Sequence, residues 1–177
     1  MTDWSKIKGV AFDIDGVMTD GGLLCTADGE FLRIYDAKDA FAVRMAAMHG
    51  IPCAVISGGK SESIRMRFVH CGVKPEDIYL RSCVKMRDFE DFCSKYGLHP
   101  SEVAYFGDDL PDIPVLRAAG LGVAPADACA EAKAAADYIS PYPGGKWCMR
   151  DTMEKILKSQ GLWDVDFDTY ESMFRQA

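Results

Sequence analysis

Four polar clusters follow short apolar segments of this chain. Three contain carboxylates or a hydroxyl, and the fourth supplies a lysine. Crowded carboxylates repel one another and need a cation, and oxygen ligands without histidine or cysteine favour Mg²⁺. The clusters are Asp13 with Asp15, Ser57-Gly58-Gly59, Lys85 and the Gly107–Asp112 stretch, GDDLPD.

This combination of residue types suits phosphoryl transfer. One carboxylate can attack phosphorus and form an aspartyl phosphate. A second, two residues further on, can protonate the leaving oxygen and later deprotonate water. The Ser57 hydroxyl and the amides of the glycine loop suit phosphate oxygens. Lys85 would neutralise the charge of the nucleophile and the phosphoryl group.

Each cluster taken alone has an ordinary structural interpretation. An acid at a strand end commonly caps a turn or a helix. Ser-Gly-Gly is usually a loop, and a single lysine on a helix is usually a solvated charge. The order of the clusters and the sheet edge that they share favour a functional site, because independent turns would rarely produce both.

The segments that must position these residues alternate between strands and helices. Short apolar runs followed by helical patterns are typical of a parallel sheet covered by helices. We therefore predict an α/β fold, a three-layer, doubly wound and mostly parallel sheet whose ligands bind beyond the carboxyl ends of the strands. The predicted strands are 7–12, 52–56, 77–80, 103–106, 121–123 and 138–139, and the predicted helices are 41–49, 61–71, 84–96, 114–119, 126–136 and 149–159.

One segment interrupts the alternation directly after the first acidic cluster. Residues 22–36 indicate a β-hairpin around an Asp28-Gly29 turn. We expect a single domain over residues 1–177, with a C-terminal tail of undetermined role at about 162–177 and no insertion large enough to be a second domain.

Composition narrows the class of protein. The chain has 177 residues, a net charge of −7 and a pI near 4.9, which argues against a general nucleic-acid or acidic-membrane binder. The seven cysteines and three histidines lack metal-ligand spacing, so a zinc site is not expected. There is no leader pattern and no long apolar run, so we expect a cytoplasmic protein without a membrane span.

The ordered set of clusters resembles the haloacid dehalogenase superfamily. Its motifs match Asp13–Gly16, Ile56–Gly58, Lys85 and Gly107–Asp112. The resemblance implies that Asp13 is the nucleophile and Asp15 the general acid/base, and that Ser57 and Lys85 hold the phosphoryl group. It also implies Mg²⁺ bound by the Asp13 carboxylate, the Asp15 backbone carbonyl and Asp108, with Asp109 and Asp112 as supporting acids.

A closer resemblance is to the small capless phosphatases of eight- and nine-carbon ulosonate 8- or 9-phosphates. It rests on the stretches DIDGVMTDGG, YDAKDAFAVRM, ISGGKSESIRMRF and PGGKWCMRDTMEKIL. The resemblance implies a sugar-acid phosphate substrate, most simply 3-deoxy-D-manno-octulosonate 8-phosphate from lipopolysaccharide synthesis. It also implies a homotetramer in which the hairpins pack centrally and neighbouring subunits complete the site.

The same resemblance assigns candidate substrate-binding residues. Guanidinium groups among them would suit a sugar carboxylate. The sequence departs from the family pattern at Gly59, Ala40, Trp147-Cys148 and Asp151, which leaves the choice of sugar acid open. The assigned residues are Gly58, Gly59, Asp36, Lys38, Asp39, Arg44, Arg67 and Arg150.

Three alternatives remain open from the sequence. The substrate could be a nine-carbon ulosonate 9-phosphate. The domain could be a non-catalytic assembly module, like those fused to sialic-acid-activating synthetases, although its catalytic residues are all present. A mutase is disfavoured, because mutases of this superfamily usually need a cap to exclude water and none is encoded.

Overall fold

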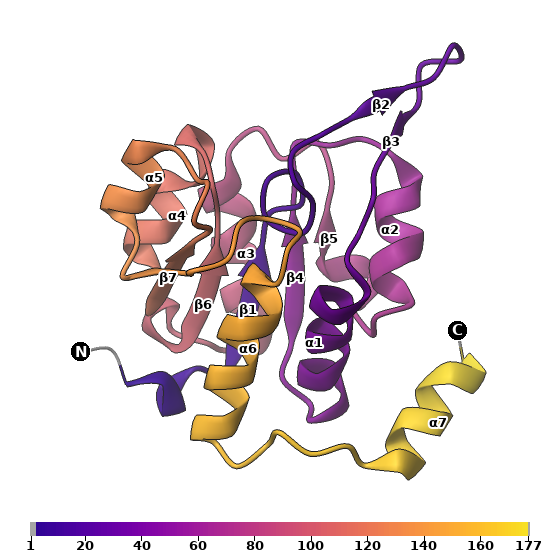
Figure 1. Ribbon diagram of the computed structural model, residues 1–177. Helices are drawn as coiled ribbons and strands as arrows, with labels where there is room; N and C mark the ends of the chain where they lie inside the picture. The colour runs from indigo at the N-terminus through magenta and orange to yellow at the C-terminus, as the bar shows by residue number, and fades with distance from the viewer. Residues whose placement is uncertain (1–2, 177) are drawn as a thin grey trace.

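A parallel six-stranded sheet forms the centre of the molecule. A computed structural model describes residues 3–176 and is drawn in Figure 1. The strand order is β5-β4-β1-β6-β7-β8, and every neighbouring pair runs parallel. The strands are β1 (Gly9–Phe12), β4 (Cys53–Ile56), β5 (Ile78–Tyr79), β6 (Val103–Phe106), β7 (Leu121–Ala124) and β8 (Tyr138–Ile139).

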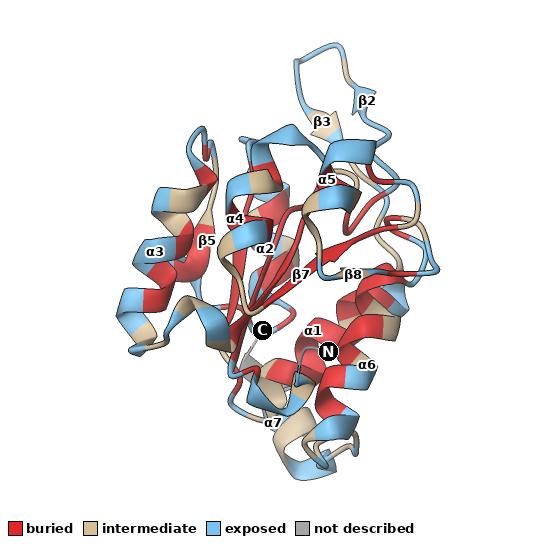
Figure 2. Cartoon of the chain, turned by 90° about the vertical axis from the view of Figure 1, so that its left-hand side faces the viewer, coloured by how far each residue is buried: buried red, intermediate tan, exposed pale blue. Residues whose placement is uncertain are grey.

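Helices cover both faces of this sheet, which makes three layers (Figures 1 and 2). One face carries α1 (Ala37–Met48), α2 (Glu62–Val69) and α6 (Cys148–Ser159); the other carries α3 (Lys85–Tyr96), α4 (Ile113–Ala118) and α5 (Ala130–Ala135). The doubly wound α/β fold predicted from the sequence is confirmed.

Two hydrophobic cores lie between these layers. Because successive strand residues point to opposite faces, Val10 and Phe12 of β1 join the core under α1, α2 and α6, while Ala11 between them joins the core under α3, α4 and α5. Each central strand is buried along its whole length. Such rigid, fully covered strands give their carboxyl ends fixed positions.

The predicted hairpin after β1 is present but shorter than expected. Its strands β2 (Leu24–Cys25) and β3 (Phe31–Leu32) pair antiparallel, and Gly29 in the turn has a φ of +85°. Figure 1 shows the hairpin projecting beyond the carboxyl edge of the sheet. The exposed Leu24 side chain shows why the pairing ends early, since no other layer covers this ribbon.

Several element boundaries differ from the predicted ones. Helix α1 begins four residues earlier than predicted, because the Asp36 carboxylate accepts hydrogen bonds from the amides of Lys38 and Asp39 and caps it. Helix α5 begins four residues later, at Ala130. Residues 4–6 form a 3₁₀ turn, so β1 starts at Gly9.

The C-terminal tail forms a further helix, α7 (Phe167–Gln176). Tyr170 packs edge-on against Phe41 of α1, with ring centroids 5.9 Å apart. The predicted domain and tail also include residues 1, 2 and 177, which lie outside the described residues. Over the described part of the chain, none of the helices is long and apolar enough to cross a membrane.

Candidate active site

Asp13 lies at the topological switch point of the sheet, where β1 and β6 are neighbours. Its amide donates to the carbonyl of Phe106, the last residue of β6, at 3.0 Å. Its carboxylate accepts a hydrogen bond from the Ile14 amide at 2.7 Å. The side chain is therefore held at the carboxyl edge and is 8% exposed, enough to meet a ligand from one side.

Lys85 connects two of the predicted acids. Its ammonium group lies 2.7 Å from Asp13 Oδ2 and 2.6 Å from Asp112 Oδ1. Burial alone would lower the pKa of Lys85, but the carboxylates of Asp13 and Asp112 raise it above its ordinary value. The charged lysine therefore compensates the buried acids.

Asp112 is fully buried and all of its acceptor directions are used. Oδ1 accepts from Lys85 and from the Tyr105 hydroxyl at 2.5 Å, and Oδ2 accepts from the amides of Asp108 at 3.1 Å and Asp109 at 3.2 Å. This carboxylate holds Lys85 and the loop after β6 in place. It fits the supporting role expected for it.

Asp13, Asp108 and Asp112 could hold a metal ion, since one carboxylate oxygen from each lies within 4.8 Å of the others. Burial raises the pKa of Asp13 to about 6, with Lys85 opposing and Asp112 adding to the rise. Burial, Asp13 and Asp112 raise the pKa of Asp108 to about 7.

Asp108 is the group that most needs a cation. In the described residues its carboxylate accepts no hydrogen bond, in contrast to the saturated Asp112. An all-carboxylate donor set with raised pKa values fits a hard divalent cation such as Mg²⁺. Asp13 and Asp108 are the side chains that would bind it.

Gly16 makes room for this pair of acids. A Cβ at position 16 would lie 2.0 Å from Asp108 Oδ2, and the backbone φ of +88° also disfavours any other residue. The glycine after the second aspartate is therefore required both by the turn and by the close approach of Asp108.

Asp15 is held by a residue that was not among the predicted site residues. The Arg33 guanidinium, from the segment after β3, binds both Asp15 oxygens, at 2.6 and 2.8 Å. Its side chain is only 3% exposed, and the hydrogen bond to Asp15 raises the pKa of Arg33. The hairpin thus reaches back and orients the predicted general acid/base.

The Ser57-Gly58-Gly59 loop also lines the site. The Ser57 amide donates to the Tyr79 carbonyl at 2.9 Å, and the Ser57 carbonyl accepts from the Ser82 amide at 3.0 Å. These bonds hold Ser57, directly after β4, against the end of β5 and the segment that follows it. A pocket of about 440 Å³ results, lined by Asp13, Asp15, Ser57, Gly58, Gly59, Ser82, Cys83, Lys85, Asp108, Asp109, Pro111 and Asp112. All seven predicted catalytic, metal and supporting residues line it.

Six predicted substrate-binding residues lie outside this pocket in the chain. Asp36 caps α1, and the buried Asp39 accepts from the amides of Trp147 and Arg150, at 3.0 and 2.8 Å. Lys38 stacks over Trp147, and the Arg150 side chain pairs with Glu154. These residues join α1 to α6, and their substrate role stays a prediction.

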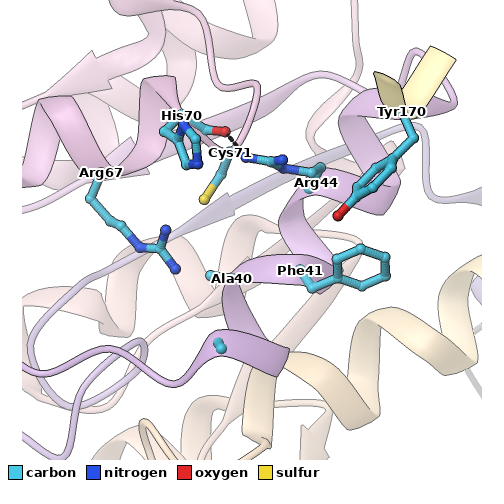
Figure 3. Close-up of a pocket in the computed structure, with 8 residues that line it drawn as sticks. Ala40, Phe41, Arg44, Arg67, His70, Cys71 and Tyr170 are labelled. Carbon is cyan, nitrogen blue, oxygen red and sulfur yellow. Dashed lines mark hydrogen bonds between the residues drawn. The ribbon is translucent and has the colours of Figure 1, made fainter. Parts of the chain in front are cut away.

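Arg44 and Arg67 line a separate pocket of about 150 Å³ between α1, α2 and α7 (Figure 3). The Arg44 guanidinium donates to the His70 carbonyl and lies over Tyr170, while that of Arg67 points into the pocket. Their role in substrate binding also stays a prediction, because neither residue lines the pocket of Asp13.

Comparison with known proteins places this chain in a family. Residues 62–143 match the family model of haloacid dehalogenase-like hydrolases. The 3-deoxy-D-manno-octulosonate 8-phosphate phosphatase of Salmonella typhi is 34% identical over 93% of this chain and 86% of its own length. The chain belongs to the haloacid dehalogenase-like hydrolases. It is a phosphoric monoester hydrolase of the capless type.

Two solved structures show the same fold with metal bound. The Moraxella catarrhalis octulosonate 8-phosphate phosphatase, a complex with a magnesium ion, a phosphate ion and KDO, has a TM-score of 0.85 and 30% identity, covering 97% of this chain and 95% of that one. The cobalt-bound Haemophilus influenzae enzyme has a TM-score of 0.86 and 32% identity, covering 96% of both. The family of this chain therefore includes divalent-metal enzymes.

Proposed function

We propose that this protein hydrolyses 3-deoxy-D-manno-octulosonate 8-phosphate, with Mg²⁺, to the free sugar acid and phosphate. The observation that carries the proposal is the pocket in which Lys85 bridges the nucleophile-type Asp13 and the buried Asp112, beside Asp108 and Asp15. The relatives with that activity, at 30–34% identity over most of the chain, support the substrate.

In the first step, a carboxylate oxygen of Asp13 attacks phosphorus and the bond from phosphorus to the sugar oxygen breaks. Asp15 gives its proton to that oxygen. In the second step, Asp15 takes a proton from water, the water oxygen attacks the aspartyl phosphate, and Asp13 is regenerated.

The remaining groups of the pocket would compensate the negative charge of the phosphoryl group and of the acids. Lys85 and the Ser57-Gly58-Gly59 loop line the same pocket as Asp13 and would contact the phosphoryl oxygens. Asp13 and Asp108 would hold Mg²⁺, which would supply positive charge against the phosphoryl group and relieve the repulsion between the two acids. Arg33 binds both Asp15 oxygens and fixes the position of that side chain, and one of the two contacts must open for Asp15 to carry the proton.

The substrate is tested by comparing phosphate release from the eight-carbon 8-phosphate and the nine-carbon 9-phosphate with Mg²⁺. A kcat/KM at least tenfold higher for the 8-phosphate supports the proposal. A preference for the 9-phosphate would replace the substrate and keep the reaction. Absence of turnover with both, and with a broad panel of phosphomonoesters, would instead favour the assembly role.

A homotetrameric assembly through the hairpins belongs to the same proposal. Leu23, Leu24, Leu32 and Ile34 expose apolar surface on and beside the hairpin, Ile34 to 87%. Exposed apolar patches of this kind commonly mark interfaces. Light scattering should give four times the monomer mass, and Ile34→Glu should reduce it. A monomer at assay concentration would contradict the assembly.

A further inference from the structure

A second cavity adjoins the catalytic pocket on the hairpin side. It has a volume of about 570 Å³ and shares Asp15, Gly58 and Gly59 with the pocket of Asp13. Because the same residues line both spaces, the two adjoin, and a ligand whose phosphate lies at Asp13 can extend its remaining atoms into this cavity. It is lined by Asp15, Leu23, Phe31, Arg33, Gly58, Gly59, Lys60, Ser61 and Arg81.

The lining of this cavity is mainly positively charged, although the chain carries a net charge of −7. Three cations line it, from three separate segments, against the single carboxylate of Asp15. Arg33 already forms a two-point pair with that carboxylate. The side chains of Lys60 and Arg81 form no hydrogen bond or ion pair with residues 3–176, so their charge is available to a ligand.

Arg81 is held in an unusual backbone conformation. Its φ is +58°, a left-handed value that non-glycine residues adopt at a cost. The Arg81 amide donates to the Gly59 carbonyl at 2.9 Å, which ties the loop after β5 to the glycine loop of the active site. An arginine at a position where glycine would fit more easily indicates a use for its side chain.

The neighbouring Gly59 leaves space for the Arg33 guanidinium. A Cβ at position 59 would lie 2.9 Å from Ile64 Cδ1 and 3.1 Å from the Arg33 guanidinium. At Gly59 the cavity is therefore lined by backbone, and Arg33 and Arg81 supply charge to it. Leu23 and Phe31 add apolar surface to the same cavity.

We propose that Arg81, with Lys60, binds the carboxylate of the leaving sugar acid and so selects acidic over neutral phosphate esters. The inference rests on the proposed phosphatase function and extends it to the determinant of substrate charge. A guanidinium group and an ammonium group that line the same cavity match a carboxylate at the far end of the substrate. The cavity is also of the size that binds small ligands.

The test compares acidic and neutral substrates on matched variants. Arg81→Gly and Arg81→Asn remove the charge and keep a residue that tolerates φ of +58°. Arg81→Lys keeps the charge, and Arg117→Ala removes an exposed arginine of α4 outside both pockets. Kinetics are measured with the octulosonate 8-phosphate, the nonulosonate 9-phosphate and neutral mannose 6-phosphate, and the melting temperature checks folding.

We expect Arg81→Gly and Arg81→Asn to lower the acid-to-neutral ratio of kcat/KM by about tenfold or more, mainly through KM for the acid. Arg81→Lys should keep most of the ratio, and Arg117→Ala all of it. The melting temperature of Arg81→Gly should stay equal or rise, since the strained conformation suits glycine.

The outcomes separate this inference from the proposed function. If the wild type prefers the 9-phosphate, the proposed substrate fails while the ratio still tests Arg81. If the wild type shows no preference for acids, or if Arg81→Gly lowers activity on acidic and neutral esters equally, the role of Arg81 is overturned.

Discussion

At the scale of single residues, the site is a set of carboxylates with different partners. Asp112 has four hydrogen bonds and acts as a fixed support, whereas the Asp108 carboxylate has none from the described residues. Asp13 lies between these extremes, paired with Lys85. The chemistry of each acid follows from its partners more than from its residue type.

The raised pKa values of Asp13 and Asp108 would make metal binding at these residues dependent on pH. Asp13 and Asp108 have pKa values of about 6 and about 7 in the folded chain, above the ordinary 3.8. Without a cation, these groups bind protons more tightly when folded, so their contribution to stability rises as the pH falls from about 7 towards 4. Protons therefore compete with Mg²⁺.

We expect the increase in melting temperature caused by Mg²⁺ to be largest above about pH 7 and to vanish below about pH 5. Thermal unfolding with MgCl₂ and with EDTA across this range measures it. An Mg²⁺ effect that stayed constant through the range would show that these two carboxyls do not bind the cation.

Gly16 gives a substitution test of the same metal site. Gly16→Ala places a Cβ against Asp108 at a left-handed φ, and we expect a loss of about 2 kcal/mol or more in the free energy of unfolding. The Mg²⁺-induced stabilisation should also be lost. Gly58→Ala is the matched control, because a Cβ there meets nothing within 4 Å; equal effects of the two substitutions would contradict this account.

At the scale of elements, the hairpin takes part in the site directly. Arg33 beyond β3 binds Asp15 beyond β1, so an insertion between the first strand and the first helix orients the expected acid/base. The hairpin is also anchored at its turn end, where the Ser61 hydroxyl donates to the Glu30 carboxylate at 2.8 Å. We therefore expect its position to affect turnover.

Removing the contact between Arg33 and Asp15 should lower turnover without unfolding the sheet. We expect Arg33→Ala to reduce kcat by about tenfold to a hundredfold, because Asp15 loses its two-point partner. Arg33→Lys should recover only part, since an ammonium group cannot form the paired contact. Arg87→Ala, an exposed arginine on α3, serves as control. An unchanged kcat in Arg33→Ala would remove Arg33 from the mechanism.

The elements also explain which parts of the site could be predicted. Asp13, Ser57, Lys85 and Asp108 follow buried parallel strands, and the shared edge of such strands brings their residues together. Arg33 was missed, because the direction of a hairpin's return segment depends on the twist of a ribbon that no layer covers. Asp36 was assigned to substrate although Asp36-x-x-Asp39 at a helix start also indicates a cap.

At the scale of the whole molecule, charge is distributed unevenly. A chain with a net charge of −7 places Lys85 in its deepest acidic cluster and Arg33, Lys60 and Arg81 in the cavity beside it. Such local positive charge suits a substrate with a phosphate at one end and a carboxylate at the other.

The central claim is that Asp13 attacks the phosphate of a sugar-acid ester. The most direct test is Mg²⁺-dependent phosphate release from octulosonate 8-phosphate by the wild type and by Asp13→Asn, which keeps the size of the side chain and removes the nucleophile. We predict turnover by the wild type and none above background by a folded Asp13→Asn variant. Phosphate release by the variant at the wild-type rate would contradict the account.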